Sequence, residues 1–567
     1  MEAPQTLPLG YDSFAGLRED NCIFADKTRL IYELVKVKTP VFLSRPRRFG
    51  KTLLVSVLEA ILKGRKDLFE GLWIYDQEYD WTPHPVINLN LAGVESDTPE
   101  GLENRLGYRV GLIARQEQIE LVPGAPADLF LALIQELFRK YGERVAILID
   151  EYDAPILEHF GDTDLAEKIR KTLKSFYGAL KSCPEERGFI FITGVSKFAK
   201  TSLFSGLNNL TDLTLEKKYA NIVGFTIEEF DNLFKEHMEE TLNEFISTNS
   251  IEEIKTIADL KTQILGWYDG YSWDGKTSVL NPWALLTFFR RKEFGNFWLD
   301  TGHPGFLEKM IKTGQITFVD IFNKDFFTDS MNIIDIGDRI NLKALLFQTG
   351  YLTVARTEFT GVGTHYFLNF PNLEIKTSVA QLCLSLEDPI KDPLLLVTQG
   401  KAILETLINR DAAGFRLALE SFINNFSYRV FTYNENFYSM IFTLAIAFSG
   451  QLCEPQREVA GGVMDLHFRS RYGDDFVIEF KYVPLPPIED NSYERAKKEL
   501  MEEARDKAFE QIERKRYYFR FQGGGNKIFK TALIFGGRAE ILVDFQEARN
   551  WRLEWNEKLR SYAVKET

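Results

Sequence analysis

Short apolar runs alternate with amphipathic stretches over roughly the first 220 residues of this chain. An apolar run bounded by polar residues predicts a buried strand, and apolar residues at three- and four-residue spacing predict a helix. The predicted strands cover residues 40–44, 85–91, 145–149 and 189–193. Buried strands that alternate with helices are typical of a parallel sheet with helices on its faces, so we predict an α/β fold here.

The pattern changes twice further along the chain. Residues 226 to about 410 are richer in helical periodicity and predict a mostly helical connecting domain without a catalytic cluster. From Glu435 onward the pattern predicts a long helix, strands at 464–469 and 476–482, a second long helix over 493–517 and a strand at 531–535. We therefore predict an α/β multidomain protein with domains at 1–222, 223–410 and 411–567.

Composition narrows the classes of function. Hydrophobic residues make up 45% of the 567 residues and charged residues 26%, which is typical of a folded globular protein. The net charge of −14 argues against a generally basic nucleic-acid-binding surface, so any such contact must be a local groove. The four cysteines form no CxxC pair and predict buried free thiols. The N-terminal residues lack a secretory pattern, and the apolar window 440–448 is too short to cross a membrane, so we expect a cytoplasmic protein.

A phosphate-binding loop is predicted in the run SRPRRFGKT, between an apolar strand and an amphipathic helix. Gly50 would let the backbone approach a phosphate, Lys51 would reach the β- and γ-phosphates, and the Thr52 hydroxyl would bind Mg²⁺. Arg45 stands where the common GxxxxGK[ST] motif has its first glycine. The alternative interpretation is a basic corner between a strand and a helix.

An acidic pair follows the third predicted strand in VAILIDEYD. Asp150 is suited to hold Mg²⁺, and Glu151 to polarise the water that attacks the γ-phosphate. Thr193, at the end of the next strand, is suited to sense the γ-phosphate, although a turn-capping role for Thr193 and Ser196 explains them nearly as well. We assign nucleotide contacts to Arg45, Arg47, Arg48, Phe49, Gly50, Lys51, Thr52, Asp150 and Thr193.

These motifs resemble a known family. FADKTRLI, FLSRPRRFGKT, HPVINLNL, ILIDEYDAPI and FITGVSKF, followed by WYDGYSW, VLNPWALL and LLFQTGYLTV, are similar to the bacterial and archaeal AAA-ATPase-like proteins fused to a PD-(D/E)XK nuclease domain. The resemblance covers most of the chain in the same order. It implies a P-loop NTPase sheet, ATP as the nucleotide and a C-terminal restriction-endonuclease-like fold. In that family the loop reads RPRRFGK[ST], so Arg45 matches the family's own form.

A second group of chemically suited residues lies near the C-terminus, in GGVMDLHF and VIEFKYV. Residues two apart on a strand share a face, so Glu479 and Lys481 lie together, and a hairpin with the preceding strand would bring Asp465 to them. Two carboxylates can hold Mg²⁺ or Mn²⁺, and the lysine can orient water or stabilise charge during phosphodiester hydrolysis. Alternating charges on a half-exposed strand are the alternative. We regard His467 as structural.

The resemblance implies further roles near this cluster. It suggests Glu435 as an additional metal ligand and Gln511 as a residue near the metal or the substrate, whereas solvent-facing helix positions explain both equally well. The family commonly has an arginine where this chain has Val463, which removes a phosphate contact. Basic side chains on the second long helix suit either a nucleic-acid groove or a helix with internal ion pairs. They are Lys497, Lys498, Arg505, Lys507, Arg514, Lys515 and Arg516.

Together these patterns predict an ATP-binding and ATP-hydrolysing domain that is coupled to a metal-dependent nuclease whose expected substrate is DNA. Two alternatives stay open. One is a nucleotide-dependent switch whose C-terminal domain binds nucleic acid or protein without cutting it. The other is an ATPase that uses the nuclease fold as a scaffold and assembles with partners, including copies of itself as a homo-oligomer.

Overall fold

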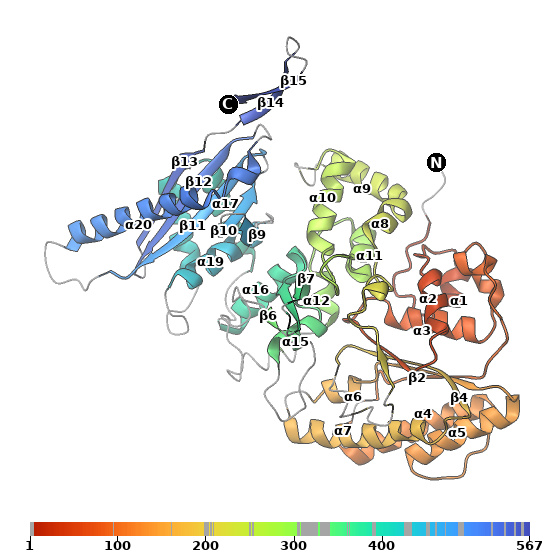
Figure 1. Ribbon diagram of the computed structural model, residues 1–567. Helices are drawn as coiled ribbons and strands as arrows, with labels where there is room; N and C mark the ends of the chain where they lie inside the picture. Colours follow the sequence, from red (N-terminus) through yellow and green to blue (C-terminus); the bar gives the residue numbers. More distant parts are fainter. Residues whose placement is uncertain are drawn as a thin grey trace. The chain divides into compact units, whose positions relative to one another are not determined.

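The computed structural model describes residues 5–94, 96–159, 162–197, 203, 207, 209–248, 251, 254–302, 307, 327–328, 341–359, 361, 363–387, 393–424, 434–449, 454–459, 462–470, 472–485, 493–522, 526–537, 540–548, 551–556 and 561–566. The backbone forms two compact units (Figure 1). The first comprises Met1–Lys309 and Asp325–Ile375, and the second comprises Met310–Lys324 and Lys376–Thr567. The predicted division into domains at 222/223 and 410/411 stays a prediction.

The first unit is built on a five-stranded, fully parallel sheet. Its strands are β1 (Val41–Ser44), β2 (Val86–Asn90), β3 (Val145–Asp150), β4 (Arg187–Gly194) and β5 (Thr211–Asp212). Their spatial order is β2-β3-β4-β1-β5, so β4 separates the strand before the phosphate loop from the strand that ends at Asp150. The predicted parallel sheet is confirmed, and the two-residue β5 was not predicted because it is too short to show a pattern.

Helices cover both faces of this sheet (Figure 1). On one face lie α1 (Phe14–Glu19), α2 (Thr28–Val35) and α3 (Lys51–Leu62); on the other lie α4 (Pro99–Gln116), α5 (Pro126–Tyr141) and α7 (Thr163–Gly178). The short α6 (Ala154–Leu157) directly follows the turn after β3. Apolar residues of α4, α5 and α7 form one continuous core with the strands. Burial of both sheet faces explains why the strands read as unbroken apolar runs.

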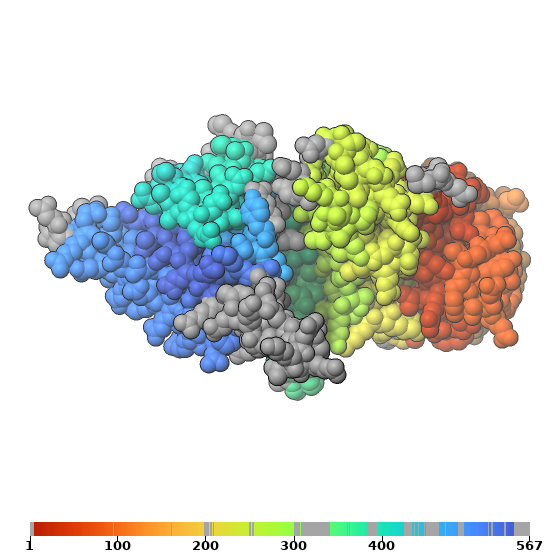
Figure 2. All heavy atoms as spheres, turned by 90° about the horizontal axis from the view of Figure 1, so that it is seen from above, coloured from red at the N-terminus to blue at the C-terminus, as the bar shows by residue number. Residues whose placement is uncertain are grey.

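The remainder of the first unit is mostly helical, as predicted. Two of its helices begin with capping boxes, in which Thr226 and Thr256 pair with the third helical residues Glu229 and Asp259. In Figure 2 the yellow-green surface of these helices adjoins the red surface of the N-terminal residues. A three-stranded sheet of order β6-β8-β7 was not predicted. The elements are α8 (Ile227–Leu233), α9 (Lys235–Thr248), α10 (Ile257–Tyr268), α11 (Pro282–Arg291), α12 (Phe297–Gly302), β6 (Phe327–Thr328), α15 (Leu342–Gln348), β7 (Thr353–Phe359) and β8 (Thr364–Asn369).

The second unit has a mixed five-stranded sheet of order β13-β12-β11-β10-β9. Its strands are β9 (Glu454–Val459), β10 (Gly462–Arg469), β11 (Asp475–Val483), β12 (Ile528–Gly536) and β13 (Glu540–Glu547). The strands β10 and β11 form the predicted antiparallel hairpin, and β11 runs parallel to β12. A separate antiparallel pair, β14 (Trp551–Asn556) with β15 (Ser561–Glu566), follows the sheet.

Helices pack on this second sheet as well. The long α20 (Tyr493–Lys515) connects the parallel strands β11 and β12 and buries Met501, Ala508 and Ile512 against them. The helix α19 (Glu435–Phe448) packs on β11 through Phe442, whose ring lies 5.6 Å from that of Phe480. The helices α17 (Pro393–Ile408) and α18 (Ala412–Ile423) contact α19 and each other, and α16 (Leu373–Glu387) precedes them in the chain.

The structure also bears on the predictions about the cysteines and about membrane-spanning segments. Cys22 and Cys183 are buried free thiols, as predicted. Within the described residues, no helix is both long enough and apolar enough to cross a membrane.

Candidate nucleotide and nuclease sites

The phosphate loop leaves β1 at Ser44 and enters α3 at Lys51, as the sequence predicted. Two of its residues adopt left-handed backbone angles, Arg48 with φ 76° and Gly50 with φ 86°. Glycine adopts this angle without steric cost, and nothing lies within 4 Å of the position that a β-carbon on Gly50 would occupy. The turn therefore directs the backbone amides at the start of α3 towards one point, which suits an anion.

Acidic side chains lie beside the basic Lys51 and the Thr52 hydroxyl of the loop. The buried Lys51 ammonium donates to the carbonyl of Pro46 at 3.1 Å and lies 3.4 Å from Glu151 Oε1. Thr52 Oγ1 donates to Asp150 Oδ2 at 2.7 Å. Burial, followed by the charge of Glu151, raises the pKa of Asp150 to about 6. The residues predicted from two distant motifs are thus in direct contact.

The Asp150 carboxylate is held from further directions. Its Oδ1 accepts the backbone N–H of Glu151 at 2.9 Å, and its Oδ2 lies 3.4 Å from the Asn90 amide nitrogen at the end of β2. We did not predict Asn90. Asn90 lies directly beside Asp150 in the parallel pairing of β2 with β3. The sequence alone does not show that these two strands are neighbours, so Asn90 could not be linked to Asp150 from it.

A cavity of about 600 Å³ opens beside the loop. Its charged end is formed by the loop with Asn90 and Glu151, and its more apolar walls come from residues 8–12, 23–25 and 222–225 together with Trp283 and Leu286. Arg47, Arg48, Phe49, Gly50, Lys51 and Thr52 all line it. This volume fits a ligand of nucleotide size.

Aromatic side chains from the mostly helical part of the first unit contact the phosphate loop. Trp298 Nε1 donates to the Arg47 carbonyl at 2.9 Å, and the Arg48 guanidinium lies 4.7 Å from the centre of the Trp283 ring. The Phe49 ring meets the edges of Tyr271 and Trp273, at 4.7 and 5.7 Å between centroids. The sequence analysis contained Trp273 and Trp283 only within the family-like segments WYDGYSW and VLNPWALL and did not single out Trp298, because no spacing links these residues to the loop.

In the second unit, the predicted carboxylates occupy neighbouring strands. Leu466 of β10 pairs with Ile478 of β11, so the next position in the antiparallel register sets Asp465 opposite Glu479. Asp465 Oδ2 accepts the N–H of Phe480 at 3.0 Å, and the Lys481 ammonium donates to Glu479 Oε1 at 2.6 Å. Asp465, Glu479 and Lys481 therefore converge.

Glu479 is fully buried, and its Oε2 has no hydrogen-bond partner among the described residues. Burial, followed by the charge of Asp465, raises the pKa of Glu479 to about 8. Although burial acts in the opposite direction, the charges of Glu479, Glu435 and Asp465 raise the pKa of Lys481 above its ordinary value. A buried carboxylate oxygen without a partner fits a cation that is bound by oxygen ligands.

Glu435 and Gln511 lie at the edge of this cluster. Glu435 is the first residue of α19, and its charge acts on both Glu479 and Lys481. Gln511 Nε2 donates to the Tyr517 hydroxyl at 3.4 Å, and the pKa of Tyr517 is raised by burial and by the charges of Glu479 and Asp465. Among the described residues, no group of three or more His, Cys, Asp or Glu side chains is close enough together to hold a metal ion.

Two family models match the regions of the chain that contain these residues. Residues 8–204 match the family model described as predicted AAA-ATPase, AAA-ATPase-like, and residues 433–545 match that of the PD-(D/E)XK nuclease superfamily. The chain joins an AAA-ATPase-like domain to a PD-(D/E)XK nuclease superfamily domain. It is also 29% identical, over 95% of its length and 98% of the relative's, to a protein of Azotobacter chroococcum mcd 1 named "Uncharacterized protein in vnfD 5'region".

Arg45 does not line the cavity of the AAA-ATPase-like domain, unlike the other assigned loop residues. Its guanidinium is fully buried and donates to the carbonyls of Ser44, Thr214 and Tyr219 at 2.8 to 3.0 Å. It also lies 4.0 Å from the centre of the Trp273 ring, and burial lowers its pKa to about 9. In this placement Arg45 joins the end of β1 to Thr214 and Tyr219.

Thr193 and Ser196 are also engaged away from the cavity. Thr193 Oγ1 donates to the carbonyl of Leu43 at 2.7 Å, which joins β4 to β1. Ser196 donates from both its backbone and its hydroxyl to Asp153. The Thr193 hydroxyl therefore makes a contact between two strands, whereas Ser196 contacts the turn after β3. The assignment of Thr193 to the nucleotide is not supported by these contacts.

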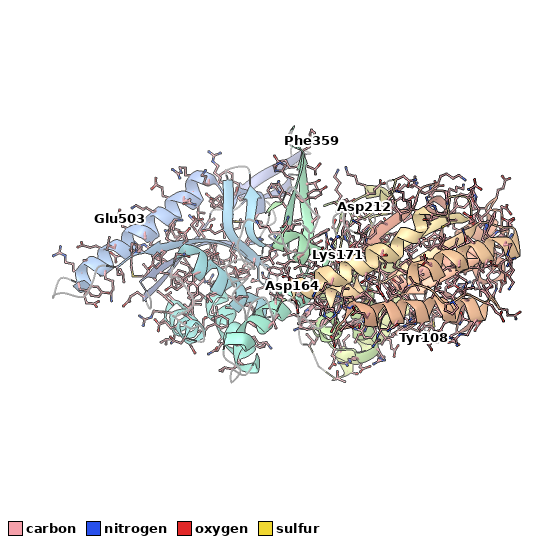
Figure 3. The ribbon with its side chains drawn as sticks, turned by 90° about the horizontal axis from the view of Figure 1, so that it is seen from below. Tyr108, Asp164, Lys171, Asp212, Phe359 and Glu503 are labelled. Atoms are coloured by element: carbon pink, nitrogen blue, oxygen red, sulfur yellow. The ribbon has the colours of Figure 1, made fainter. Side chains whose placement is uncertain are left out.

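In the nuclease domain, His467 is structural, as the sequence analysis held: its Nε2 lies 2.9 Å from the buried Asp475, and its ring stacks on Phe521. Four of the basic residues on α20 form ion pairs with acidic neighbours; they are Lys497, Lys498, Arg505 and Lys507. Glu503, the partner of Lys507, lies on the exposed face of this helix (Figure 3). Val463 belongs to β10, but its side chain lies outside the described part of the chain.

Proposed function

We propose that this protein binds and hydrolyses ATP at the phosphate loop and cleaves DNA at the carboxylate cluster of its nuclease domain. One observation carries the proposal most: Lys51, Thr52, Asp150 and Glu151 meet beside a left-handed Gly50 at the charged end of a nucleotide-sized cavity. The mostly helical segment, which supports the loop, couples nucleotide state to the second domain in this proposal. The cytoplasmic location stays a prediction.

At the ATP site, each side chain has one chemical task. Lys51 exchanges its contact with Glu151 for the β- and γ-phosphate oxygens, which releases the glutamate to orient and deprotonate the attacking water. The Thr52 hydroxyl and the Asp150 carboxylate, 2.7 Å apart, present the hard oxygen atoms that Mg²⁺ prefers. Bound Mg²⁺ would neutralise charge that develops on the phosphates.

At the nuclease site, Asp465 and Glu479 would supply oxygen ligands for Mg²⁺ or Mn²⁺. Glu479 Oε2 has no hydrogen-bond partner in the described part of the chain, and this supports the assignment, because an unsatisfied buried carboxylate oxygen is costly without a cation. When bound, the metal lowers the pKa of a water and neutralises the scissile phosphate. Lys481 holds Glu479 in place and adds a positive charge beside the phosphate position. Glu435 and Gln511 keep their proposed roles at the edge of the site.

The experiment measures ATP turnover and plasmid cleavage by the full chain, with Mg²⁺ or Mn²⁺, in the wild type and in two variants. Lys51→Ala should abolish ATP turnover, and Glu479→Ala should abolish cleavage while leaving turnover intact. Lys63→Ala, at an exposed lysine just after α3, is the matched control for the first variant.

The outcomes separate the alternatives. ATP turnover without cleavage of DNA or RNA would favour the nucleotide-dependent switch with an inert nuclease fold. A change of molecular mass on addition of ATP, in the absence of cleavage, would favour the scaffold that assembles as a homo-oligomer. Cleavage that survives Glu479→Ala would contradict the assignment of the nuclease site.

A further inference from the structure

The turn after β3 holds the proposed catalytic Glu151 in an unusual backbone conformation. Glu151 has φ 51°, a left-handed angle that residues with a side chain rarely adopt and that persists only where surrounding contacts impose it. Neighbouring turn residues make such contacts, since Glu151 donates its N–H to Asp150 Oδ1 and Tyr152 donates its N–H to the carbonyl of Thr193 at 3.2 Å. The direction of the Glu151 side chain therefore depends on how this turn is fixed.

Asp153, the last residue of the turn, is completely buried and binds the end of a different strand. Its Oδ1 accepts the N–H of Val195 at 3.2 Å, and its Oδ2 accepts the N–H of Ser196 at 2.6 Å and the Ser196 hydroxyl. We call Asp153, Val195 and Ser196 the strand-end bridge. It joins the turn after β3 to the residues that directly follow β4.

Two further features show that the bridge is closely fitted. Tyr152 is buried, and its hydroxyl donates to the carbonyl of Ser196 at 2.8 Å, so a second side chain spans the same gap. A β-carbon on Gly194 would lie 2.2 Å from Asp153 Oδ1 and 2.6 Å from the Tyr152 ring, so only glycine leaves room for both. The carbonyl of Val195 in turn accepts the hydroxyl of Ser44, at the start of the phosphate loop.

We propose that Asp153 is a positioning residue for ATP hydrolysis, which holds Glu151 in its left-handed conformation through the strand-end bridge and so keeps its carboxylate beside Lys51 and the γ-phosphate. The inference rests on the proposed ATPase function. Asp153 does not line the cavity, and it acts only through the backbone of the turn. Loss of the bridge frees Glu151 to return to a right-handed angle, which moves its carboxylate away without changing the loop that binds the phosphates.

The test compares Asp153→Asn and Ser196→Ala with the wild type and with Glu151→Gln. Asp153→Asn replaces one accepting carboxylate oxygen with an NH2 group, which cannot accept the hydrogen bonds that Ser196 donates. Ser196→Ala removes only the hydroxyl and preserves the backbone hydrogen bonds. The three readouts are kcat for ATP, the affinity and stoichiometry of a fluorescent ATP analogue, and the melting temperature. Asp164→Asn, at an exposed position on α7 (Figure 3), is the matched control.

We expect Asp153→Asn to lower kcat by about 100-fold and Ser196→Ala by about 10-fold, with analogue affinity within about twofold of the wild type and full stoichiometry. A purely structural role would lower stoichiometry and kcat in proportion, and that result, or an unchanged kcat in both variants, would overturn the proposal. Should Asp153→Asn fail to fold, Ser196→Ala alone decides between these outcomes. Absence of turnover in the wild type would instead refute the ATPase function, and Glu151→Gln sets the level expected when the base is lost.

Discussion

Each candidate site holds a buried carboxylate, but the two carboxylates differ in how many protein contacts they make: Asp150 is the last residue of β3, and Glu479 lies in the middle of β11. At the nucleotide site, Asp150 accepts from Thr52 and from the N–H of Glu151, with the Asn90 amide nearby. At the nuclease site, Glu479 pairs with Lys481 through one oxygen, while the other has no partner among the described residues. Burial raises the pKa of both carboxyls, to about 6 and about 8 respectively.

The difference indicates what each site needs before it can act. The protein itself supplies nearly all contacts of Asp150, so the nucleotide site is organised in advance and a ligand has only to displace Glu151 from Lys51. In the proposed nuclease site a bound cation would complete Glu479, because a buried carboxylate oxygen without a partner among the described residues is costly. We therefore expect the first site to be sensitive to the loss of single side chains and the second to pH and divalent metal.

The largest expected effect tests the organisation of the nucleotide site at Thr52. Thr52→Ala removes the hydroxyl that contacts Asp150, and ATP turnover should fall on the order of 100-fold, since even the outer partners of metal ligands cost 10- to 100-fold. Thr52→Ser keeps the hydroxyl and should retain most of the turnover. Titration of turnover against Mg²⁺ measures the effect. Equal turnover in the two variants would mean that the hydroxyl has no part in the site.

The next effect concerns Arg45, a buried cation whose guanidinium donates to three backbone carbonyls. Arg45→Met should destabilise the first unit by about 3 kcal/mol, because those carbonyls lose their charged donor. Denaturant unfolding checks this, with Arg65→Met at an exposed position as the control. Affinity for ATP under folded conditions should be unchanged. Intact stability with lost ATP affinity would restore the direct nucleotide contact that the sequence predicted for Arg45.

The stability of the second unit, which contains the nuclease site, should depend on pH through Glu479. The pKa of Glu479 is raised from 4.5 to about 8 in the folded protein, so the folded state retains a proton that the unfolded state releases. This contribution to stability is complete below pH 4.5 and is lost as the pH rises through about 8. In EDTA, the melting temperature of the second unit should fall by about 5 °C across this window.

Glu479→Gln should flatten that slope because the amide does not titrate, and Mg²⁺ or Mn²⁺ should reduce it in the wild type. Glu503→Gln, at an exposed position on α20, should leave the slope unchanged. A slope that persists in Glu479→Gln would assign the proton to another group.

The smallest expected effect tests the hydrogen bond between Trp298 and the phosphate loop. Trp298→Phe removes the indole N–H that donates to the Arg47 carbonyl, and the Kd for ATP should rise about threefold, as expected for one neutral hydrogen bond. Fluorescent-nucleotide titration measures the change. Trp73→Phe, at a partly exposed tryptophan of the same unit, is the control. An unchanged Kd would show that the loop holds its shape without this contact.

The sequence by itself determined the elements and the residue types at both sites. Apolar runs located β1 to β4 and β12, because strands that are buried on both faces must be apolar on both faces, and the segments GGVMDLHF and VIEFKYV located β10 and β11. The GKT run and the Asp150–Glu151 pair were identified because phosphate chemistry requires those groups where strands and helices begin or end, and the Asp465, Glu479 and Lys481 cluster because metal chemistry requires carboxylates on one face of neighbouring strands.

Only the tertiary structure decided which of these residues share an environment. Strand order set Asn90 beside Asp150, and the β4–β1 contact occupied the Thr193 hydroxyl, neither of which follows from position along the chain. Arg45 was assigned to the nucleotide because it lies in the loop motif, yet burial against Trp273 and three carbonyls directs its guanidinium elsewhere. A motif determines which groups are available, whereas long-range packing determines the direction in which each one points.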